Sequence, residues 1–246
     1  MTGPASMPAP LLVLWDLDLT LLDPAGFGTR MIAPVLEQRL GREPVLDVPF
    51  AGRTDRAILT ALLGSNGMVP DDDNATVHPE LITVMDAVAE RCERFGHDLL
   101  DAGGGPLPGA REAVRALSGD PLVHQGIVTG NMKRTALLKL RLCGFDGLPD
   151  PGLGAFGDDH LDRADLVREA VASTRGRDLD VLPGRTVVIG DHVHDVRGAL
   201  DAGVRFVGVA TGRVSAEDLR EAGAHVVLPD LTSPRAVVDA VHAACS

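Results

Sequence analysis

The sequence repeats one pattern, a short and continuously apolar run followed by a segment with helical periodicity. This alternation is typical of a parallel β-sheet whose strands are connected through helices. Apolar runs without polar alternation indicate strands that are buried on both faces. The pattern therefore predicts an α/β fold with a doubly wound parallel sheet. The predicted strands are residues 11–15, 122–128, 186–189, 205–209 and 225–228, and the predicted helices are 109–117, 131–142, 163–174, 193–202, 216–222 and 234–244.

Between the first strand and Gly109 the alternation stops. This part of the chain has helical patterns at 28–40, 56–63 and 81–99, and we find no convincing strand in it. A stretch rich in Gly and Pro at 101–109 suits a hinge where the segment ends. The acidic run 71–74 is expected to be a solvated turn. We therefore expect a core domain formed by residues 1–23 and 105–246, with an all-helical insert at 24–104.

Composition narrows the classes of protein. The chain has 246 residues, of which 45% are apolar, so it can bury a sizeable core. Its formal net charge of −12 disfavours binding to nucleic acids and to acidic membrane surfaces. The apolar run 11–15 is too short for a signal sequence and has no basic residue before it, and the 3 cysteines are too far apart for a disulfide framework or a zinc site. We expect a soluble, unprocessed, cytoplasmic protein that binds neither nucleic acid nor membrane.

Polar residues follow three of the predicted strands. Because ligands of open α/β sheets bind beyond the carboxyl ends of the strands, these residues are expected to surround one crevice. Carboxylates this close together repel one another unless a cation lies among them. Oxygen ligands and a phosphate-sized substrate favour Mg²⁺. The residues are Asp16, Asp18 and Thr20 after the first strand, Thr129, Gly130 and Asn131 after the second, and Asp191 and Asp195 after the third.

Each of these groups also has an ordinary structural explanation. A pair of aspartates after a strand can cap a loop, Thr129 can begin a helix, and Asp195 can offset a helix dipole. The combination of all three at strand ends favours catalysis. His192 and His194 flank Asp191 but are expected to point to different sides of a helix start, so we do not expect them to share a metal ion.

In these motifs the chain resembles the haloacid dehalogenase superfamily of hydrolases, and the resemblance covers essentially its whole length. Asp16-x-Asp18-x-Thr20 is similar to the first motif of the family, Thr129 to the second, and Gly190-Asp191-x-x-x-Asp195 to the fourth. The helical segment 24–104 is similar in position to the small helical cap, of the type called C1, that many members carry. The resemblance implies a Rossmann-like core with an inserted cap, and phosphatase chemistry.

The same resemblance implies a role for each matched residue. Asp16 would attack phosphorus to form an aspartyl phosphate, and Asp18 would act as general acid and then general base. Asp16, the backbone carbonyl of Asp18, and Asp191 would bind Mg²⁺, with Asp195 orienting that group. The transferring phosphoryl oxygens would be held by Thr129 and by the nearby groups of Gly130 and Asn131. Dehalogenases themselves lack an acid at the position of Asp18, so this residue favours phosphate over carbon–halogen chemistry.

The chain departs from the family at its third motif, which is normally a lysine before the strand that carries the fourth. The two lysines, Lys133 and Lys139, both follow Thr129, on what we expect to be the wrong helix. Arg163 stands near the expected place, and its guanidinium could neutralise Asp16 and the phosphoryl group. Arg168, one turn further on, is the second candidate. The alternative is that Arg163 is a surface charge at a helix start.

Substrate selection is expected to depend on the insert. The stretch 51–55 is similar to the equivalent part of phosphoglycolate phosphatase-like members, and Arg53 could bind a substrate carboxylate. The alternative for Arg53 is a surface turn with Asp55. We expect a magnesium-dependent phosphatase that acts on a small phosphorylated metabolite. A phosphoglucomutase-like phosphotransferase and a non-catalytic binder of phosphorylated ligands remain open, whereas phosphonate hydrolysis through a cap lysine is excluded because residues 24–104 contain no lysine.

Overall fold

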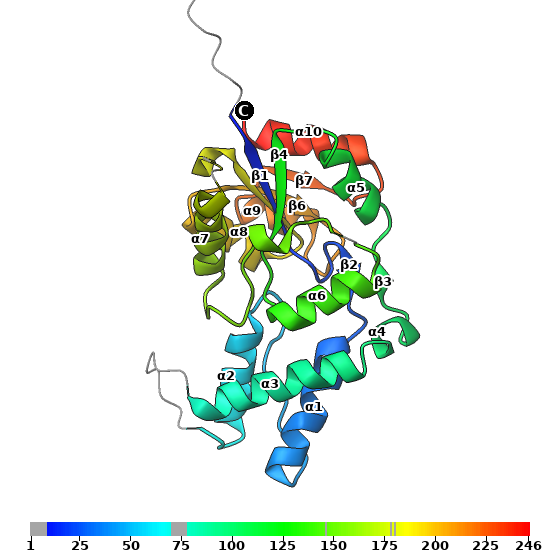
Figure 1. Cartoon of the computed structure of the whole chain (residues 1–246), viewed down its shortest axis with the longest axis vertical. Helices are drawn as coiled ribbons and strands as arrows, with labels where there is room; N and C mark the ends of the chain where they lie inside the picture. The colour runs from blue at the N-terminus through cyan, green and yellow to red at the C-terminus, as the bar shows by residue number, and fades with distance from the viewer. Residues whose placement is uncertain (1–8, 70–77, 146, 178, 180) are drawn as a thin grey trace, which may run out of the picture.

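A five-stranded parallel sheet forms the centre of the protein (Figure 1). The structure is a computed structural model, and it describes residues 9–69, 78–145, 147–177, 179 and 181–246. The acidic run 71–74 lies outside these residues. The strand order confirms the predicted doubly wound α/β fold. In the order of the sheet, the strands are β4 (Val123–Ile127), β1 (Leu11–Trp15), β5 (Thr186–Gly190), β6 (Arg205–Val209) and β7 (Val226–Leu228).

Successive residues of the central strand β1 face two separate apolar clusters, as the pleat of a strand requires. Leu11, Val13 and Trp15 belong to the first cluster, and Leu12 and Leu14 belong to the second. The Trp15 indole donates a hydrogen bond to Gln125 Oε1 of β4 over 2.9 Å, so its one polar atom is satisfied. The sheet is therefore buried on both faces, which explains why the central strands β1 and β5 are apolar almost throughout.

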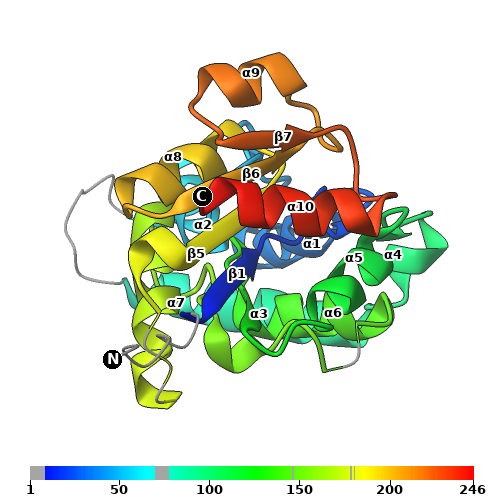
Figure 2. The same cartoon turned by 90° about the horizontal axis from the view of Figure 1, so that it is seen from above.

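Helices cover both faces of this sheet (Figure 2). The helices α5 (Ala110–Leu117) and α10 (Pro234–Ala244) add apolar side chains to the first cluster. The second cluster is covered by α7 (Arg163–Ser173), α8 (Val193–Asp201) and α9 (Ala216–Glu221). The helix α8, which follows β5, thus lies on the opposite face of the sheet from α5. Because the connections of neighbouring strands turn to opposite faces, a crevice opens at the carboxyl ends of the central strands.

The strand register brings three loops to that crevice. Trp15, the last residue of β1, pairs with Ile127 of β4 and with Ile189 of β5. Because the strands are parallel, the residues that follow these three positions emerge side by side at one edge of the sheet. The segments that begin at Asp16, Thr129 and Asp191 therefore lie together.

Between β1 and α5, the described residues form four helices that lie together at one end of the molecule (Figure 1). The helix α3 packs against α1 and α2, and also against α6 (Lys133–Leu142) of the core. Apolar side chains of these insert helices continue the first cluster beyond the sheet. The insert helices are α1 (Phe27–Leu40), α2 (Asp55–Ser65), α3 (Pro79–Arg94) and α4 (Asp98–Asp101).

Two sequence expectations for this region are wrong. Two short strands, β2 (Leu22–Asp23) and β3 (Gly105–Pro106), pair antiparallel where the chain enters and leaves the insert. Strands of two residues are too short to show a period in the sequence, so no strand was expected there. The segment 81–99, expected as one helix, is divided between α3 and α4 around Gly96.

Among the described residues, no helix combines the length and apolar character needed to span a bilayer.

Candidate active site

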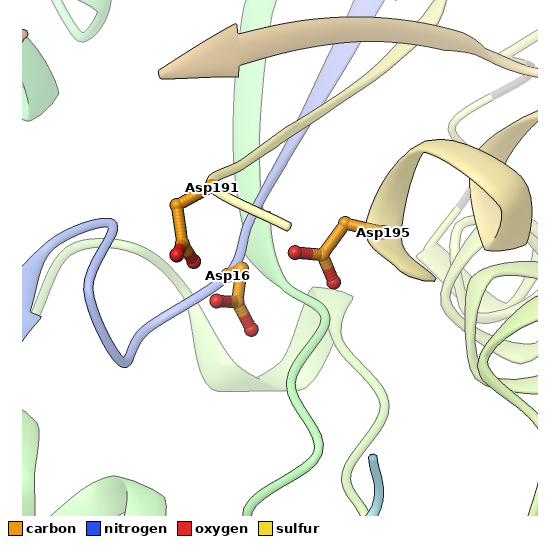
Figure 3. A group of neighbouring side chains, drawn as sticks. All are labelled: Asp16, Asp191 and Asp195. Carbon is orange, nitrogen blue, oxygen red and sulfur yellow. The ribbon is translucent and has the colours of Figure 1, made fainter. Parts of the chain in front are cut away.

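Three aspartates meet at the carboxyl end of the sheet (Figure 3). Asp16 follows β1, Asp191 follows β5, and Asp195 lies in the first turn of α8. Each offers a carboxylate oxygen, and these oxygens all lie within 4.8 Å of one another. All three side chains are buried. Such a cluster concentrates negative charge in a place that water reaches poorly.

The pKa values of two of these carboxyl groups reflect that charge. Burial raises the pKa of Asp16 above its usual value, an effect that Arg163 opposes and Asp18 increases. Burial, followed by the charge of Asp16, raises the pKa of Asp191 to about 7. A divalent cation between these groups would stabilise their charged forms and so oppose both shifts. The donor set consists of oxygen atoms, which fits Mg²⁺.

Arg163 lies directly beside this cluster. It is the first residue of α7, whose N-terminus is capped by the Asp162 side chain. Its Nη2 donates to Asp16 Oδ1 over 3.4 Å, and its Nη1 forms an ion pair with Asp195. Its Nε donates to the backbone carbonyl of Gly52 in the insert over 2.9 Å. The guanidinium therefore holds Asp16, Asp195 and the insert together. Arg168 pairs instead with Asp165, so it does not reach the aspartate cluster.

Lys139 also reaches the site, and the expectation that its helix carries it elsewhere is wrong. Its Nζ donates to both carboxylate oxygens of Asp18, over 2.8 and 2.7 Å, and to Asn131 Oδ1 over 2.6 Å. The Lys139 side chain is fully buried, and it enters the site from the second half of α6. Lys133, at the start of the same helix, is exposed and lies over the Phe156 ring. The Lys139 ammonium is thus bonded to Asp18, whereas the Arg163 guanidinium is bonded to Asp16.

The loop before α6 supplies further polar groups. Thr129 Oγ1 accepts hydrogen bonds from the backbone N–H of Asn131 over 3.2 Å and from its Nδ2 over 3.0 Å. Asn131 Nδ2 also donates to Asp18 Oδ2 over 3.3 Å. A side chain at Gly130 would collide with the Arg53 carbonyl, since a Cβ there would lie 2.2 Å from that oxygen. These contacts connect Thr129 to Asp18 through Asn131.

Thr20 belongs to the site, although the sequence analysis assigned it no role beyond completing a motif. Its hydroxyl lies 3.4 Å from Asp16 Oδ2 and 3.3 Å from Asp191 Oδ1. Its side chain is fully buried. A signal for this contact was present, because Asp16, Asp18 and Thr20 are the only polar residues in the segment 16–22, whose other residues are leucines.

His192 and His194 differ from their expected arrangement. Their rings stack with centroids 5.0 Å apart, so the expectation that they point to different sides is wrong. His192 is the N-cap of α8 and accepts from the backbone N–H of His194, which turns the chain enough to align the rings. Burial lowers the pKa of His192 to about 4, so it is uncharged near neutral pH. Among the described residues, the metal-ligand cluster contains only aspartates.

The insert contacts the core along a short seam of backbone. The Asp55 N–H donates to the Gly130 carbonyl over 2.6 Å, and the Arg56 N–H donates to the Gly157 carbonyl over 3.0 Å. The Asp55 carboxylate accepts from the Met132 N–H over 2.8 Å at the start of α6. A Cβ at Gly52 would lie 2.3 Å from the His192 ring, so the seam requires glycine there. The N-terminus of α2 is thereby fixed over the catalytic loops.

A cavity of about 640 Å³ lies between this part of the insert and the core. Its lining includes Asp16, Asp18, Arg163 and Asp191. Arg53 lines it as well, and its Nη2 donates to the Ala57 carbonyl over 3.3 Å. The residues predicted for the site, with the exception of the fully buried Thr129, therefore line one cavity together with Lys139, which the sequence analysis had set aside.

Comparison with known proteins is consistent with this site. Residues 164–234, which include Asp191 and Asp195, match the family model described as HAD-hydrolase-like. No curated protein sequence matches the chain. Among solved structures, a hydrolase from Pseudomonas syringae is 22% identical, with a TM-score of 0.63 over 94% of this chain and 98% of its own. A HAD family hydrolase from Deinococcus radiodurans, with bound phosphate and sodium, is 25% identical, with a TM-score of 0.54 over 96% and 99%.

A third similar structure is a candidate beta-phosphoglucomutase from Bacteroides vulgatus, which is 16% identical. Its TM-score is 0.67, and the match covers 98% of this chain and 92% of the other. These similarities extend over nearly the whole chain and establish the fold. Together with the family match over residues 164–234, they make the chain similar to haloacid dehalogenase-like hydrolases.

Proposed function

We propose that the protein is a magnesium-dependent phosphatase that hydrolyses a small phosphate monoester through an aspartyl phosphate on Asp16. One observation carries this proposal: a buried carboxylate at the end of the central strand lies against a guanidinium, and a second carboxylate stands two residues further along. Arg163 Nη2 lies 3.4 Å from Asp16 Oδ1, and Asp18 is held separately by Lys139. This arrangement supplies a nucleophile, a cation for the phosphoryl group and a proton donor within one cavity.

In the first step, an Asp16 oxygen attacks phosphorus and the bond to the leaving oxygen breaks. Asp18 enters this step in its protonated form and gives its proton to that oxygen, so that an alcohol leaves and Asp18 becomes a carboxylate. Arg163 faces the phosphoryl group with donors that stabilise the charge on its oxygens as the bond breaks. Thr129 and the backbone N–H groups at the start of α6 hold the remaining oxygens.

In the second step, Asp18, now a carboxylate, takes a proton from water, and the water oxygen attacks phosphorus. The Asp16–phosphorus bond breaks, and inorganic phosphate leaves with Asp16 regenerated. Lys139 and Asn131 keep the Asp18 carboxyl group in one orientation during both steps. Asp195 positions the Arg163 guanidinium through their ion pair.

Mg²⁺ would be held by the carboxylates of Asp16 and Asp191 and by the backbone carbonyl of Asp18, since the Asp18 carboxylate is occupied by Lys139. When bound, the ion supplies positive charge that offsets the repulsion between Asp16 and an anionic substrate. Thr20, which lies between the two carboxylates, fixes their relative orientation.

The insert is proposed to act as a helical cap over residues 24–104, with residues 1–23 and 105–246 as the core. A phosphoglycolate phosphatase-like specificity, in which Arg53 binds a carboxylate, is supported by the position of Arg53 in the cavity lining. This assignment predicts that Arg53→Ala raises KM for phosphoglycolate and leaves KM for p-nitrophenyl phosphate unchanged. A small phosphorylated metabolite is the proposed partner and Mg²⁺ the proposed cofactor, in the cytoplasm.

A phosphotransferase is the second candidate, because the similar Bacteroides vulgatus protein is named as a candidate beta-phosphoglucomutase. In that reaction a sugar hydroxyl, rather than water, would accept the phosphoryl group from Asp16. The two functions differ in their products. A phosphatase releases inorganic phosphate from a sugar phosphate, whereas a mutase yields an isomeric sugar phosphate.

The proposal is tested with the purified protein and p-nitrophenyl phosphate, with and without Mg²⁺. We expect hydrolysis that EDTA abolishes and added Mg²⁺ restores. Rapid quenching followed by peptide mass spectrometry is expected to find one phosphoryl group on the peptide that contains Asp16, and none in Asp16→Asn. Full activity in metal-free buffer, or a phosphoryl group on another residue, would overturn the mechanism.

A further inference from the structure

The helix α6 begins directly after the loop 129–131 and depends on other segments to cap its N-terminus. Its N-cap is Met132, whose side chain makes no capping hydrogen bond within the described part of the chain. The first backbone N–H groups of a helix have no acceptor inside the helix, so they need one from elsewhere. The position at which the loop becomes the helix is therefore set by contacts from outside α6.

Two carboxylates from different parts of the chain supply these acceptors. Asp55 Oδ2, at the start of the insert helix α2, accepts from the Met132 N–H over 2.8 Å. Asp158 Oδ1, in the core segment before α7, accepts from the Lys133 N–H over 3.2 Å. An anion at this end of a helix also interacts favourably with the helix dipole. The start of α6 is thus held partly by the insert and partly by the core.

The contact with the insert is reciprocal, because the loop before α6 also caps α2. The N–H of Asp55, the first residue of α2, donates to the Gly130 carbonyl over 2.6 Å. A Cβ at Gly130 would lie 2.2 Å from the Arg53 carbonyl oxygen, and a Cβ at Gly157 would lie 1.7 Å from the Gly130 carbonyl oxygen. The backbones of the insert, the loop and the core are therefore packed directly on one another, so a shift of one displaces the next.

The Asp55 carboxyl group is ionised above neutral pH. Asp55 lines the cavity and is half-buried. Burial raises the pKa of its carboxyl group to about 6, an effect that the Met132 N–H and the charge of Lys139 oppose. A hydrogen bond from an N–H to a carboxylate is roughly twice as strong as one to a neutral oxygen. Asparagine at this position would therefore keep an acceptor of similar shape but form a weaker bond.

The loop and α6 together hold the group proposed for acid–base catalysis. Asn131 Nδ2 donates to Asp18 Oδ2 over 3.3 Å, and Lys139 of α6 donates to both oxygens of that carboxylate. Thr129, which is proposed to hold phosphoryl oxygens, accepts from Asn131. A misplacement of about 1 Å at a reacting centre can cost about 10²-fold in rate. The position of the start of α6 therefore bears on the chemical step.

We infer that Asp55 is a positioning residue for the proposed reaction, which acts from the insert by fixing the start of α6 and the loop 129–131 beside Asp18. This inference rests on the proposed phosphatase function and goes beyond it, because it gives the insert an effect on kcat as well as on substrate selection. Arg53, two residues earlier, is proposed to change KM through the leaving group. One segment of the insert thus carries two separable effects.

The variants Asp55→Ala and Asp55→Asn test the role of the carboxylate with p-nitrophenyl phosphate. Asp55→Ala removes the acceptor, so kcat is expected to fall about tenfold with KM unchanged. Asp55→Asn keeps an acceptor oxygen, so its kcat is expected to lie within about threefold of the unaltered value. An unchanged kcat in Asp55→Ala, a loss carried by KM, or an Asp55→Asn no more active than Asp55→Ala would overturn the inference.

Asp158→Ala is the matched control, because it removes the other carboxylate from the same helix end and leaves both Asp55 bonds in place. Loss of a helix cap is expected to lower Tm by about 2–4 °C in each alanine variant. Only Asp55→Ala is expected to lower kcat. Equal falls in kcat would contradict the inference, since they would follow from a weaker helix end alone.

Amide hydrogen exchange separates failure of this inference from failure of the proposed function, because it needs no turnover. NMR spectra of the unaltered protein and both alanine variants would follow the Asn131 and Met132 amides. We expect Asp55→Ala to speed exchange of these amides about tenfold or more, and Asp158→Ala to leave them unchanged. If the unaltered protein hydrolyses no monoester, the phosphatase proposal fails. Faster exchange in Asp55→Ala would then still support Asp55 as the residue that positions the loop, and unchanged exchange would contradict it.

Discussion

Asp16 and Asp18 stand two residues apart in the chain, yet their surroundings differ. The Asp16 side chain is 4% exposed and lies against a guanidinium from α7, whereas the Asp18 side chain is 33% exposed and is held by an ammonium from α6. A nucleophile benefits from burial in a fixed position, because water then neither solvates nor competes with it. A group that exchanges protons with a leaving alcohol and then with water needs access to both. The difference in exposure therefore suits the two different roles proposed for these residues.

The largest expected effect comes from Asp16→Asn. An amide of nearly the same shape is a poor nucleophile, so hydrolysis is expected to fall below detection while the protein remains folded. Initial rates with p-nitrophenyl phosphate, together with a circular dichroism spectrum, check both parts. Turnover close to that of the unaltered protein would show that Asp16 is not the nucleophile. The comparison between Asp16 and Asp18 would then not describe two catalytic roles.

Asp18→Asn is expected to lower kcat by about 10²–10⁴-fold, because general acid–base catalysis is lost while the nucleophile remains. The loss depends on the leaving group. An activated aryl phosphate needs little protonation, so its hydrolysis is expected to fall less than that of an alkyl phosphate. Equal losses on both substrates would show that Asp18 does not protonate the leaving group.

Arg163→Ala is expected to reduce kcat by about 10²-fold, since a preorganised cation beside the phosphoryl group is lost. Arg163→Lys recovers part of this activity, because it restores the charge without the forked geometry. Arg168→Ala is the matched control, since that exposed side chain pairs with Asp165 on the same helix. A silent Arg163→Ala with a damaging Arg168→Ala would reverse the assignment.

Lys139→Met is expected to have the smallest effect on activity, about a tenfold loss in kcat with little change in KM, because Asp18 loses its fixed orientation. The free energy of unfolding is expected to fall by about 2 kcal/mol, since a buried cation is removed from a partly exposed partner. Lys133→Met, on the exposed start of the same helix, is the matched control. An unchanged kcat would show that Asp18 does not depend on Lys139 for its position.

Most of the fold could be predicted from the sequence. The strands β1 and β6 and the helix α10 have the predicted bounds. Mainly apolar runs and capping residues such as Ser233 mark the ends of these elements clearly in the sequence. The short strands β2 and β3 depend on contacts between distant parts of the chain, so no local sequence pattern predicted them. The division of 81–99 into two helices likewise depends on how the chain returns to the core.

The site was less predictable, and Lys139 shows why. Because Lys139 follows the second motif rather than the third, we did not expect α6 to bring it to the aspartates. The pattern of buried residues along α6 indicates the opposite. Thr135 and Lys139 lie four residues apart and are both buried, so they share one face of α6. A lysine within a buried helical stripe needs an anionic partner, and Asp18 is that partner. The stacking of His192 and His194 depends on a capping bond that the sequence alone does not show.

Trp15, which precedes Asp16 and donates to Gln125, also makes the protein easy to observe. The chain has 1 tryptophan and no tyrosine, so its long-wavelength intrinsic fluorescence arises from one indole ring. That ring is fully buried, at the end of the strand that carries Asp16. The proposed metal binding, phosphoryl transfer and substrate binding would alter charge or packing within a residue or two of it. A stopped-flow fluorescence trace of the unlabelled protein is therefore expected to report on these events without an added probe.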